Sequence, residues 1–409
     1  MTEPAVKAPE VSEPPRPPGR SFASRFLEEL TSPSPVLVTL LAIFTALVVG
    51  AVLIVFSDES VLSTWGYFFA APGDALAASW DAITAAYGAL LSGAVGSSSA
   101  LSETIVAATP LMLAGLGIAL GFRAGLFNIG AEGQVIAGGL MAGYVGFAIH
   151  GLPVFVHLPL ALLAGFAGGA AWGFIPGIIK ATTGAHEVIT TIMLNYVALN
   201  LSLYLLASST FRRPGRIDPI SKVVAVPSRL PHLAGQGLRL HAGIIVALLA
   251  AVAVAWLLGR STWGFELRAA GANPAAASTA GIDIRRATVM AMVLAGALAG
   301  LAGAGQVLGV QFSLAPNFSG GLGFDAITVA LLGRASPLGV VLAALLFGAL
   351  RAGGLNMQAA TSTPIDIVTV IQSLIVIFVA APALVRAIYR IKGARGADTG
   401  APVSKGWGG

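Results

Sequence analysis

Charged residues are scarce in this 409-residue chain, because Asp, Glu, Lys and Arg together make up only 10% of it. A soluble domain carries roughly 25% charged residues, since its surface must face water. Hydrophobic residues make up 56% of the chain, and its mean hydropathy is +0.85. These values exclude a soluble globular protein and predict a polytopic membrane protein.

Cysteine is absent, which excludes a disulfide framework, thiolate metal sites and a cysteine nucleophile. The five histidines show no metal-binding spacing, and no Ser–His–Asp arrangement or GxxxxGK[ST] phosphate loop occurs. We therefore expect no catalytic residue, no bound metal or cofactor and no ATP hydrolysis by this chain. The excess of bases, 23 against 18 acids, is explained by membrane topology rather than by a nucleic-acid partner.

Apolar runs of about 20 residues, long enough to cross a hydrocarbon core of roughly 30 Å, recur along the chain. Residues 1–35, rich in proline, are predicted to be a disordered cytoplasmic tail, 36–390 a membrane domain, and 391–409 a cytoplasmic C-terminal tail. The first run follows Glu28 and Glu29, which favours an uncleaved helix over a signal peptide. Ten helical spans are predicted, at 36–56, 104–121, 131–149, 158–179, 188–207, 242–259, 287–310, 322–333, 337–352 and 365–385. The eighth is short and interrupted by glycines, so it is either re-entrant or broken.

The placement of basic residues predicts that both termini are cytoplasmic. With the N-terminus inside, 16 of the 23 bases fall on the inner side. The exception is the outer loop 208–241, which holds six of the remaining bases. The outer segment 57–103 is rich in aromatic residues, which favours anchoring at the membrane interface.

Two pairs of short segments repeat in the same order. Residues 130–137 are similar to 323–330, and residues 187–192 are similar to 366–371, with one acid ahead of an apolar run in each. On the predicted map, spans two to five and seven to ten are therefore inverted repeats. Inverted repeats are a transporter architecture, in which broken helices line a pathway between the halves.

Ionisable groups at membrane depth are costly, so they face a cavity, a partner or the bundle interior. Glu187 and Asp366 begin predicted helices, which favours helix capping. The stretch 121–134 holds four glycines and several polar residues, and it is either a pathway element or a tight packing hinge. The substrate-pathway candidates are Asn128, Glu132, Gln134, Asn195, Tyr196 and Asp325, with Gln306 and Asn317 as further polar candidates.

The inner loop 260–286 contains a short helix with signals at both ends. Asn273 suits the N-cap, Pro274 the first turn and Gly281 the C-terminal stop. Such a helix on the cytoplasmic face is suited to contacting a partner, although an interfacial connector is the alternative.

Four stretches, 102–110, 122–134, 186–196 and 268–274, resemble permease subunits of bacterial ABC importers. The wider family serves branched-chain amino acids and simple sugars, and the closer resemblance, over residues 60–390, is to its nucleoside-importer branch. The resemblance implies a permease in the bacterial cytoplasmic membrane that works with a second, shorter permease, a substrate-binding lipoprotein and an ATPase that uses ATP and Mg²⁺. It also implies that helix 274–280 is the coupling helix, with coupling candidates Glu266, Arg268, Asn273, Pro274 and Gly281.

Other functions remain as alternatives. A sugar or a branched-chain amino acid is the alternative substrate within this family. An ion-coupled secondary transporter, with Glu132 and Asp325 as coupling carboxylates, shares the inverted repeat and the intramembrane acids. It does not explain the doubly capped inner helix.

Overall fold

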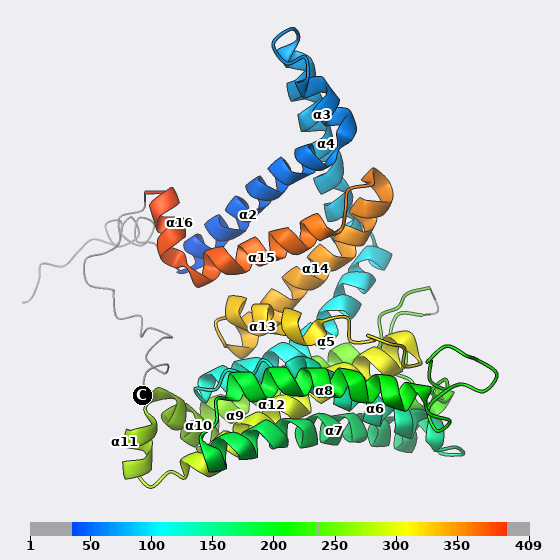
Figure 1. Ribbon diagram of the computed structural model, residues 1–409, viewed down its shortest axis with the longest axis vertical. Helices are drawn as coiled ribbons and strands as arrows, with labels where there is room; N and C mark the ends of the chain where they lie inside the picture. The colour runs from blue at the N-terminus through cyan, green and yellow to red at the C-terminus, as the bar shows by residue number, and fades with distance from the viewer. Residues whose placement is uncertain (1–34, 236, 391–409) are drawn as a thin grey trace, which may run out of the picture.

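The computed structural model describes residues 35–235 and 237–390, and their regular structure is almost entirely helical (Figure 1). The β pairing within these residues consists of two isolated bridges, Arg212–Ser221 and His232–His241. The all-α fold is thus confirmed. The predictions for the tails, residues 1–34 and 391–409, fall outside the described residues.

Each of the ten predicted spans overlaps a helix. Within the described ranges, seven helices are long and apolar enough to cross a membrane. They are α2 (Pro35–Ser57), α5 (Ser98–Arg123), α7 (Val154–Thr183), α8 (Glu187–Ala207), α9 (Gly243–Arg260), α12 (Ile284–Gln306), which continues into the π-helical turn η2 (Val307–Gln311), and α14 (Pro337–Thr361). The other three predicted spans correspond to α6 (Ala131–Ala148), α13 (Leu322–Leu332) and α15 (Asp366–Ala380), which are shorter or more polar.

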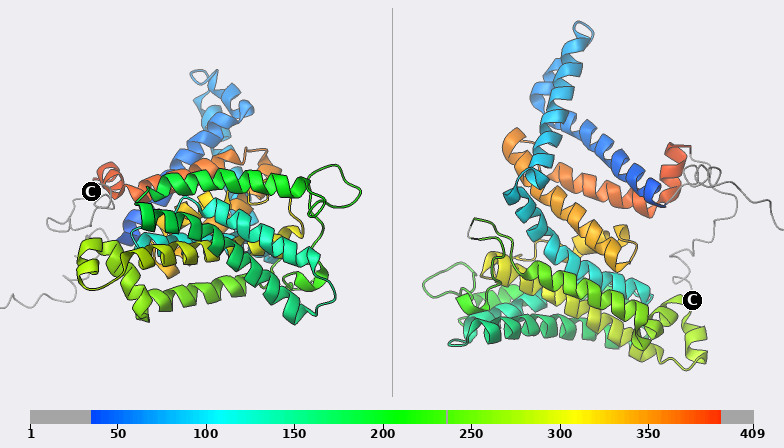
Figure 2. Two further views of the ribbon diagram at one scale, coloured as in Figure 1. Left: turned by 60° about the horizontal axis from the view of Figure 1, so that its bottom comes forward. Right: turned by 180° about the vertical axis from the view of Figure 1, so that it is seen from behind.

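The structure adds helices that hydropathy alone did not predict. The outer segment 57–103 contains α3 (Glu59–Trp65), the start of α5 and the 24-residue α4 (Pro72–Val95), which packs along α14. Polar residues along α4 hide it from a search for apolar runs. The α3–α4 hairpin projects from the other helices in each view (Figure 2). The last predicted span is divided by a proline into α15 and α16 (Pro382–Ile388).

Glycines bring the central helices into backbone contact. Helices α7 and α12 run antiparallel, with Gly169 and Gly173 of α7 against Gly296 and Gly300 of α12. A Cβ added to Gly169 would lie 2.1 Å from the carbonyl oxygen of Gly296. Small residues of this kind let membrane helices approach closely and gain dispersion contacts. This glycine seam, made by the four glycines named here, fixes α7 against α12.

The two predicted repeats exchange helices across their interface. The first helix of each repeat packs along the third helix of the other, since α5 contacts α14 and α12 contacts α7. The first helices, α5 and α12, pack together in antiparallel directions, and the broken helices α6 and α13 also meet. These reciprocal contacts agree with an inverted repeat made of α5–α8 and α12–α15.

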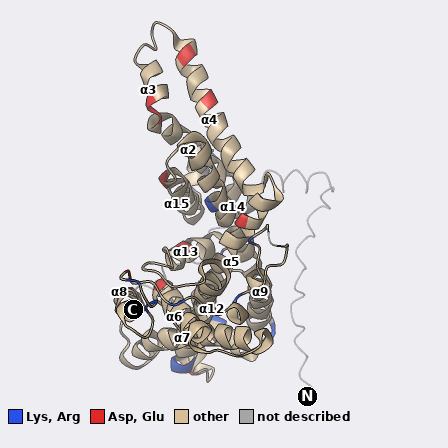
Figure 3. Ribbon diagram, turned by 90° about the vertical axis from the view of Figure 1, so that its right-hand side faces the viewer, with Lys and Arg blue, Asp and Glu red and all other residues tan. Residues whose placement is uncertain are grey.

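Short elements gather at one end of the spans. The start of α2 and the helices α10 (Thr262–Ala272), α11 (Pro274–Thr279) and α16 lie at the left of Figure 1. The connection 208–242 lies at the opposite end. The basic loop and the inner loop 260–286 are thus on opposite sides of the bundle, as the predicted map requires. Charged residues occupy little of the bundle, which is almost wholly tan in Figure 3.

Candidate functional site

The glycine-rich stretch after α5 breaks the helix and turns its polar side chains inward. Asn128 is 1% exposed, and its Nδ2 donates to Oε1 of Gln134 at 2.9 Å. The backbone N–H of Gly130 donates to Asn128 Oδ1 at 3.0 Å. Gly125 makes the sharp turn at φ +72°, a conformation that residues with a Cβ rarely adopt.

Asn195 of α8 holds the N-terminus of α6. Its Oδ1 accepts from the backbone N–H of Gly133 at 2.8 Å, and its Nδ2 donates to the carbonyl of Ile129 at 2.9 Å. The amide groups of these three residues, Asn128, Gln134 and Asn195, are therefore hydrogen-bonded within the protein, to a neighbouring amide or to the backbone. This is the arrangement expected of a packing hinge. Tyr196 is 61% exposed on the outer side of α8 and lies apart from this cluster.

Glu132 links the two repeats. It lies in the first turn of α6, but its carboxylate caps the neighbouring helix α13. Oε1 accepts from Ser319 Oγ at 2.5 Å and from the backbone N–H of Gly321 at 3.3 Å, and Oε2 accepts from the N–H of Gly323 at 2.7 Å. The N-termini of both broken helices thus meet at one carboxylate, where their dipoles stabilise negative charge. We call these four residues the Glu132 junction.

The remaining intramembrane charges lie around this junction or at helix ends. Asp325 of α13 lies 3.7 Å from Arg351 of α14, as Oδ2 to Nη1, and both are partly exposed. Arg123 donates through Nε to the carbonyl of Ala335 at 2.8 Å, which ties the end of α5 to the α13–α14 turn. Glu187 begins α8 and pairs with Lys180 at 3.0 Å.

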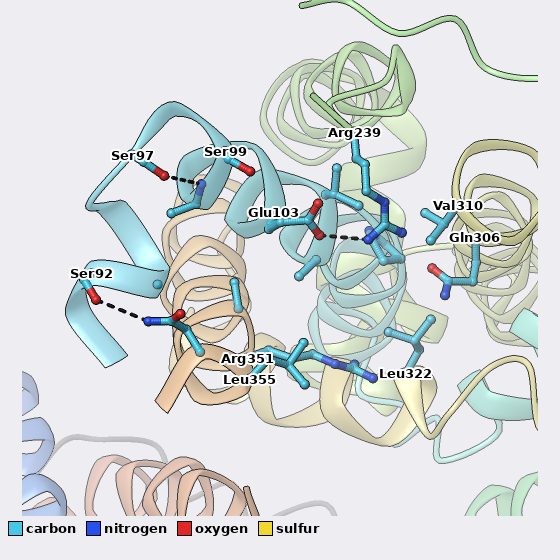
Figure 4. Close-up of a pocket in the computed structure, with 17 residues that line it drawn as sticks. Ser92, Ser97, Ser99, Glu103, Arg239, Gln306, Val310, Leu322, Arg351 and Leu355 are labelled. Atoms are coloured by element: carbon cyan, nitrogen blue, oxygen red, sulfur yellow. Dashed lines mark hydrogen bonds and ion pairs between the residues drawn. The ribbon is translucent and has the colours of Figure 1, made fainter. Parts of the chain in front are cut away.

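A cavity of about 600 Å³ lies beside the junction, between the α4–α5 turn, α5, α12, α14 and the end of the basic loop (Figure 4). Glu103 and Arg239 form an ion pair of 3.0 Å across it. Asn356 Nδ2 donates to the carbonyl of Ala89 at 2.7 Å and to Ser92 Oγ at 3.2 Å. The other polar lining residues include Gln306 and Arg351.

Sequence reasoning found only part of this cavity lining. It noted Gln306 but not Glu103, Arg239, Arg351 or Asn356. Arg351 carried a signal of its own, because it is a lone base within the apolar run of α14. The other three come from separate helices and a loop, so no spacing in the sequence brings them together.

The basic loop is held against the end of α12 by backbone hydrogen bonds. The N–H of Ser221 donates to the carbonyl of Leu314 at 2.9 Å, and Ser221 Oγ accepts from the N–H of Leu314 at 2.8 Å. Val224 donates to the carbonyl of Phe312 at 2.9 Å. Arg229 donates to the carbonyl of Val224 and lies over the ring of Phe312, 4.7 Å from its centroid. Some bases of this loop therefore stabilise its own fold.

The capped inner helix has the local structure that the sequence predicts. Asn273 Oδ1 accepts from the N–H of Ala276 at 3.1 Å, Pro274 is the first residue of α11, and Gly281 follows with φ +86°. Only Ala277 of α11 is buried. Helix α10 precedes it and was not predicted.

Helix α10 carries the other two coupling candidates and touches the α5–α6 break. Arg268 donates through Nε to the carbonyl of Gly264 at 3.2 Å, and Glu266 is half-buried. Gly271 packs against the backbone of Arg123 to Gly125, since an added Cβ would lie 2.4 Å from the Arg123 carbonyl oxygen. The exposed α11 is thus connected, through α10, to the end of α5 and the beginning of the α5–α6 break.

An all-helical bundle with exchanged repeats, broken helices at its centre and a polar cavity defines a membrane transport protein. Residues 100–380, more than half of the chain, match the family described as branched-chain amino acid transport system, permease component. The chain belongs to this family. It is therefore a permease, the membrane-spanning subunit of an ABC transporter.

Individual relatives cover most of the chain. A guanosine ABC transporter permease protein of Bacillus subtilis, NupP, is 41% identical over 86% of this chain and 95% of its own length. A nucleoside permease of Lactococcus lactis, NupB, is 37% identical over 72% of this chain and 82% of its own. A glucose permease of Haloferax volcanii, TsgB13, is 36% identical over 72% of this chain and 79% of its own. No solved structure matches the chain significantly.

Proposed function

We propose that this permease moves nucleosides across the bacterial cytoplasmic membrane, as part of an importer driven by ATP. The observation that carries the substrate is the similarity to relatives named for guanosine and nucleosides, at 41% and 37% identity. The glucose permease is 36% identical, so a sugar is the competing substrate within the same family.

The exposed helix α11 supports a docking role on the cytoplasmic side. An ATPase subunit that binds ATP and Mg²⁺ would contact α11, together with Glu266 and Arg268 of α10. This assignment makes the α11 end of the bundle cytoplasmic, and with it the start of α2 and the end of α16. The basic loop then faces outward, where a substrate-binding lipoprotein delivers the nucleoside. A second, different permease completes the membrane part, and lipid surrounds both.

Alternating access needs elements that can rearrange without unfolding. The Glu132 junction and the Asn128–Gln134–Asn195 cluster support such a role, because side-chain hydrogen bonds hold the broken helices there. Asp325, paired with Arg351 at a long distance, supports a role in the same region. Tyr196 remains a pathway candidate only if a partner subunit covers its exposed face.

The test is uptake of radiolabelled guanosine by proteoliposomes that contain the whole complex, with ATP hydrolysis measured in parallel. Ala276→Pro removes the N–H that donates to Asn273, and it disfavours the helical conformation of the preceding residue, Ala275, so we expect it to disrupt the first turn of α11. We expect uptake to fall at least tenfold while the complex still assembles and hydrolyses ATP. Ala275→Ser, an exposed change that keeps its N–H, is the control and should transport normally.

Wild-type uptake by Ala276→Pro would contradict the docking role of α11. Uptake of glucose or leucine but not guanosine would overturn the substrate. Uptake that continues without ATP and stops when the proton gradient collapses would favour the ion-coupled alternative. Membership of the permease family does not favour that alternative.

A further inference from the structure

The cavity beside the Glu132 junction draws polar groups from parts of the chain that are far apart. Glu103 comes from α5 of the first repeat, Gln306 and Arg351 from α12 and α14 of the second, and Arg239 from the loop between them (Figure 4). Its volume of about 600 Å³ lies within the range of roughly 300–1,000 Å³ that is usual for small-molecule sites.

Gln306 is the polar group that the fold explains least. It is the only polar side chain from Val289 to Val310, it is partly exposed, and no hydrogen bond joins its amide to another described residue. It lines the cavity and directly precedes the π-helical turn η2. Turns of this kind often occur at functional sites, because they redirect side chains within a helix. Because the side chain is partly exposed and lines the cavity, its amide is free to pair with water or with a ligand there.

The ion pair across the cavity can be separated at little energetic cost. The side chains of Glu103 and Arg239 are 37% and 56% exposed. A pair so exposed contributes only about 0–1 kcal/mol, so a polar ligand can replace either partner at little cost. Asn356 uses its Nδ2 on α4, but no described residue donates to its Oδ1, which leaves that oxygen as an acceptor.

We propose that this cavity is a nucleoside-binding site within the permease, and that Gln306 pairs with an edge of the base. This inference rests on the proposed function and deepens it. A base edge carries both donors and acceptors, which an amide matches with its own donor and acceptor. Val106, Val310 and Leu322 provide apolar walls for the flat base. Glu103 and the Oδ1 of Asn356 accept from the ribose hydroxyls.

A neighbouring acid and base also suit the zwitterion of an amino acid, and the hydrogen-bond acceptors of the cavity also suit the hydroxyl groups of a sugar. The free amide and the size of the cavity favour the larger nucleoside. The permease would thus select its substrate a second time, after the binding protein has released it.

The experiment measures equilibrium binding of radiolabelled guanosine to the assembled complex in lipid nanodiscs, without nucleotide and without the binding protein. We expect saturable binding to wild type and a loss of about tenfold in affinity for Gln306→Leu, because one edge of the base then loses its hydrogen-bonding partner. Leu at this position preserves the apolar helix. Asn200→Leu is the matched control, because Asn200 lies on the exposed face of α8 and bonds only within that helix. It should bind as wild type does.

Two results would overturn the site. Equal affinity of wild type and Gln306→Leu would show that Gln306 does not contact the base. Displacement of guanosine by glucose or leucine at equal concentration would show that the cavity does not select nucleosides. Either result leaves the proposed function standing if the complete complex, with its binding protein, still imports guanosine. A complete complex that imports no nucleoside would overturn the proposed function itself.

Discussion

Removing the Glu132 carboxylate should destabilise the protein more than any other single charge change among the described residues. Glu132 is 7% exposed and accepts three hydrogen bonds from the segment that begins α13. A hydrogen bond to a charged group contributes about 1.5–3 kcal/mol. In Glu132→Ala all three donors lose their acceptor in a buried site. Allowing for partial relaxation, we expect the free energy of unfolding to fall by about 4 kcal/mol.

Glu132→Gln separates the charge from the geometry. Its carbonyl oxygen can replace Oε1 and keep the bonds from Ser319 and Gly321, but its NH₂ group then faces the N–H of Gly323, donor against donor. We expect a loss of about 2 kcal/mol. Asp325→Asn is the control, since that carboxylate is partly exposed and its partner lies 3.7 Å away, so the change should cost less than about 1 kcal/mol.

The assay is equilibrium unfolding in mixed micelles, followed by the fluorescence of the six tryptophans. We expect the free energy of unfolding to be highest for wild type and Asp325→Asn, lower for Glu132→Gln and lowest for Glu132→Ala. If Glu132→Ala unfolded within 1 kcal/mol of wild type, the junction would not be a structural link between the repeats.

Three further predictions concern the seam, the inner helix and the outer loop. Gly300→Ala places a Cβ 2.3 Å from the Gly165 carbonyl and should cost about 1–3 kcal/mol in the same unfolding assay, whereas Gly305→Ala, with open space around its Cβ, should not destabilise. Asn273→Ala removes a cap worth about 1 kcal/mol, so amide hydrogen exchange within α11 should become about fivefold faster; unchanged exchange would refute the cap. Burial, aided by the charges of His232 and Arg239, lowers the pKa of His241 from 6.5 to about 4. As the pH drops, the unfolded state therefore binds the proton first, and the free energy of unfolding should fall by about 3 kcal/mol between pH 6.5 and pH 4. His241→Gln should flatten this pH dependence, and an unchanged slope would assign it to another group.

The sequence predicted the long elements well, because apolar length is a local property. The span at 36–56 and the inner helix at 274–280 match α2 and α11 closely, since hydropathy and capping residues act within a few positions. Helix α4 was missed for the same reason, because its stability comes from packing along α14 rather than from its own hydropathy.

The candidate site was predicted only in part, because its residues acquire their roles through contacts between distant segments. Polarity and glycines identified Glu132, but nothing in its local sequence shows that it caps α13. Its partner Ser319 lies 187 residues further along the chain. Polarity also marked Asn128 as a pathway candidate, yet its partners are Gln134 and Gly130 of the same break. The cavity residues on α5, α14 and the basic loop become neighbours only after the repeats have packed.

The two kinds of contact between the repeats indicate where the protein can change shape. In the glycine seam, Gly169 and Gly300 bring backbone against backbone, so any slide of α7 along α12 would meet a carbonyl oxygen within one turn. At the Glu132 junction the backbones of Gly323 and Glu132 also lie close, since a Cβ added to Gly323 would lie 2.2 Å from the Glu132 backbone nitrogen. The hydrogen bonds there, however, all depend on one carboxylate, which side-chain torsions can move. Helix α10 touches the same broken region through Gly271. A displacement of α11 would therefore reach the α5–α6 break through Gly271 and the start of α12, which α10 and α11 both contact. Through the break it would reach the Glu132 junction and the cavity that adjoins α13 at Leu322.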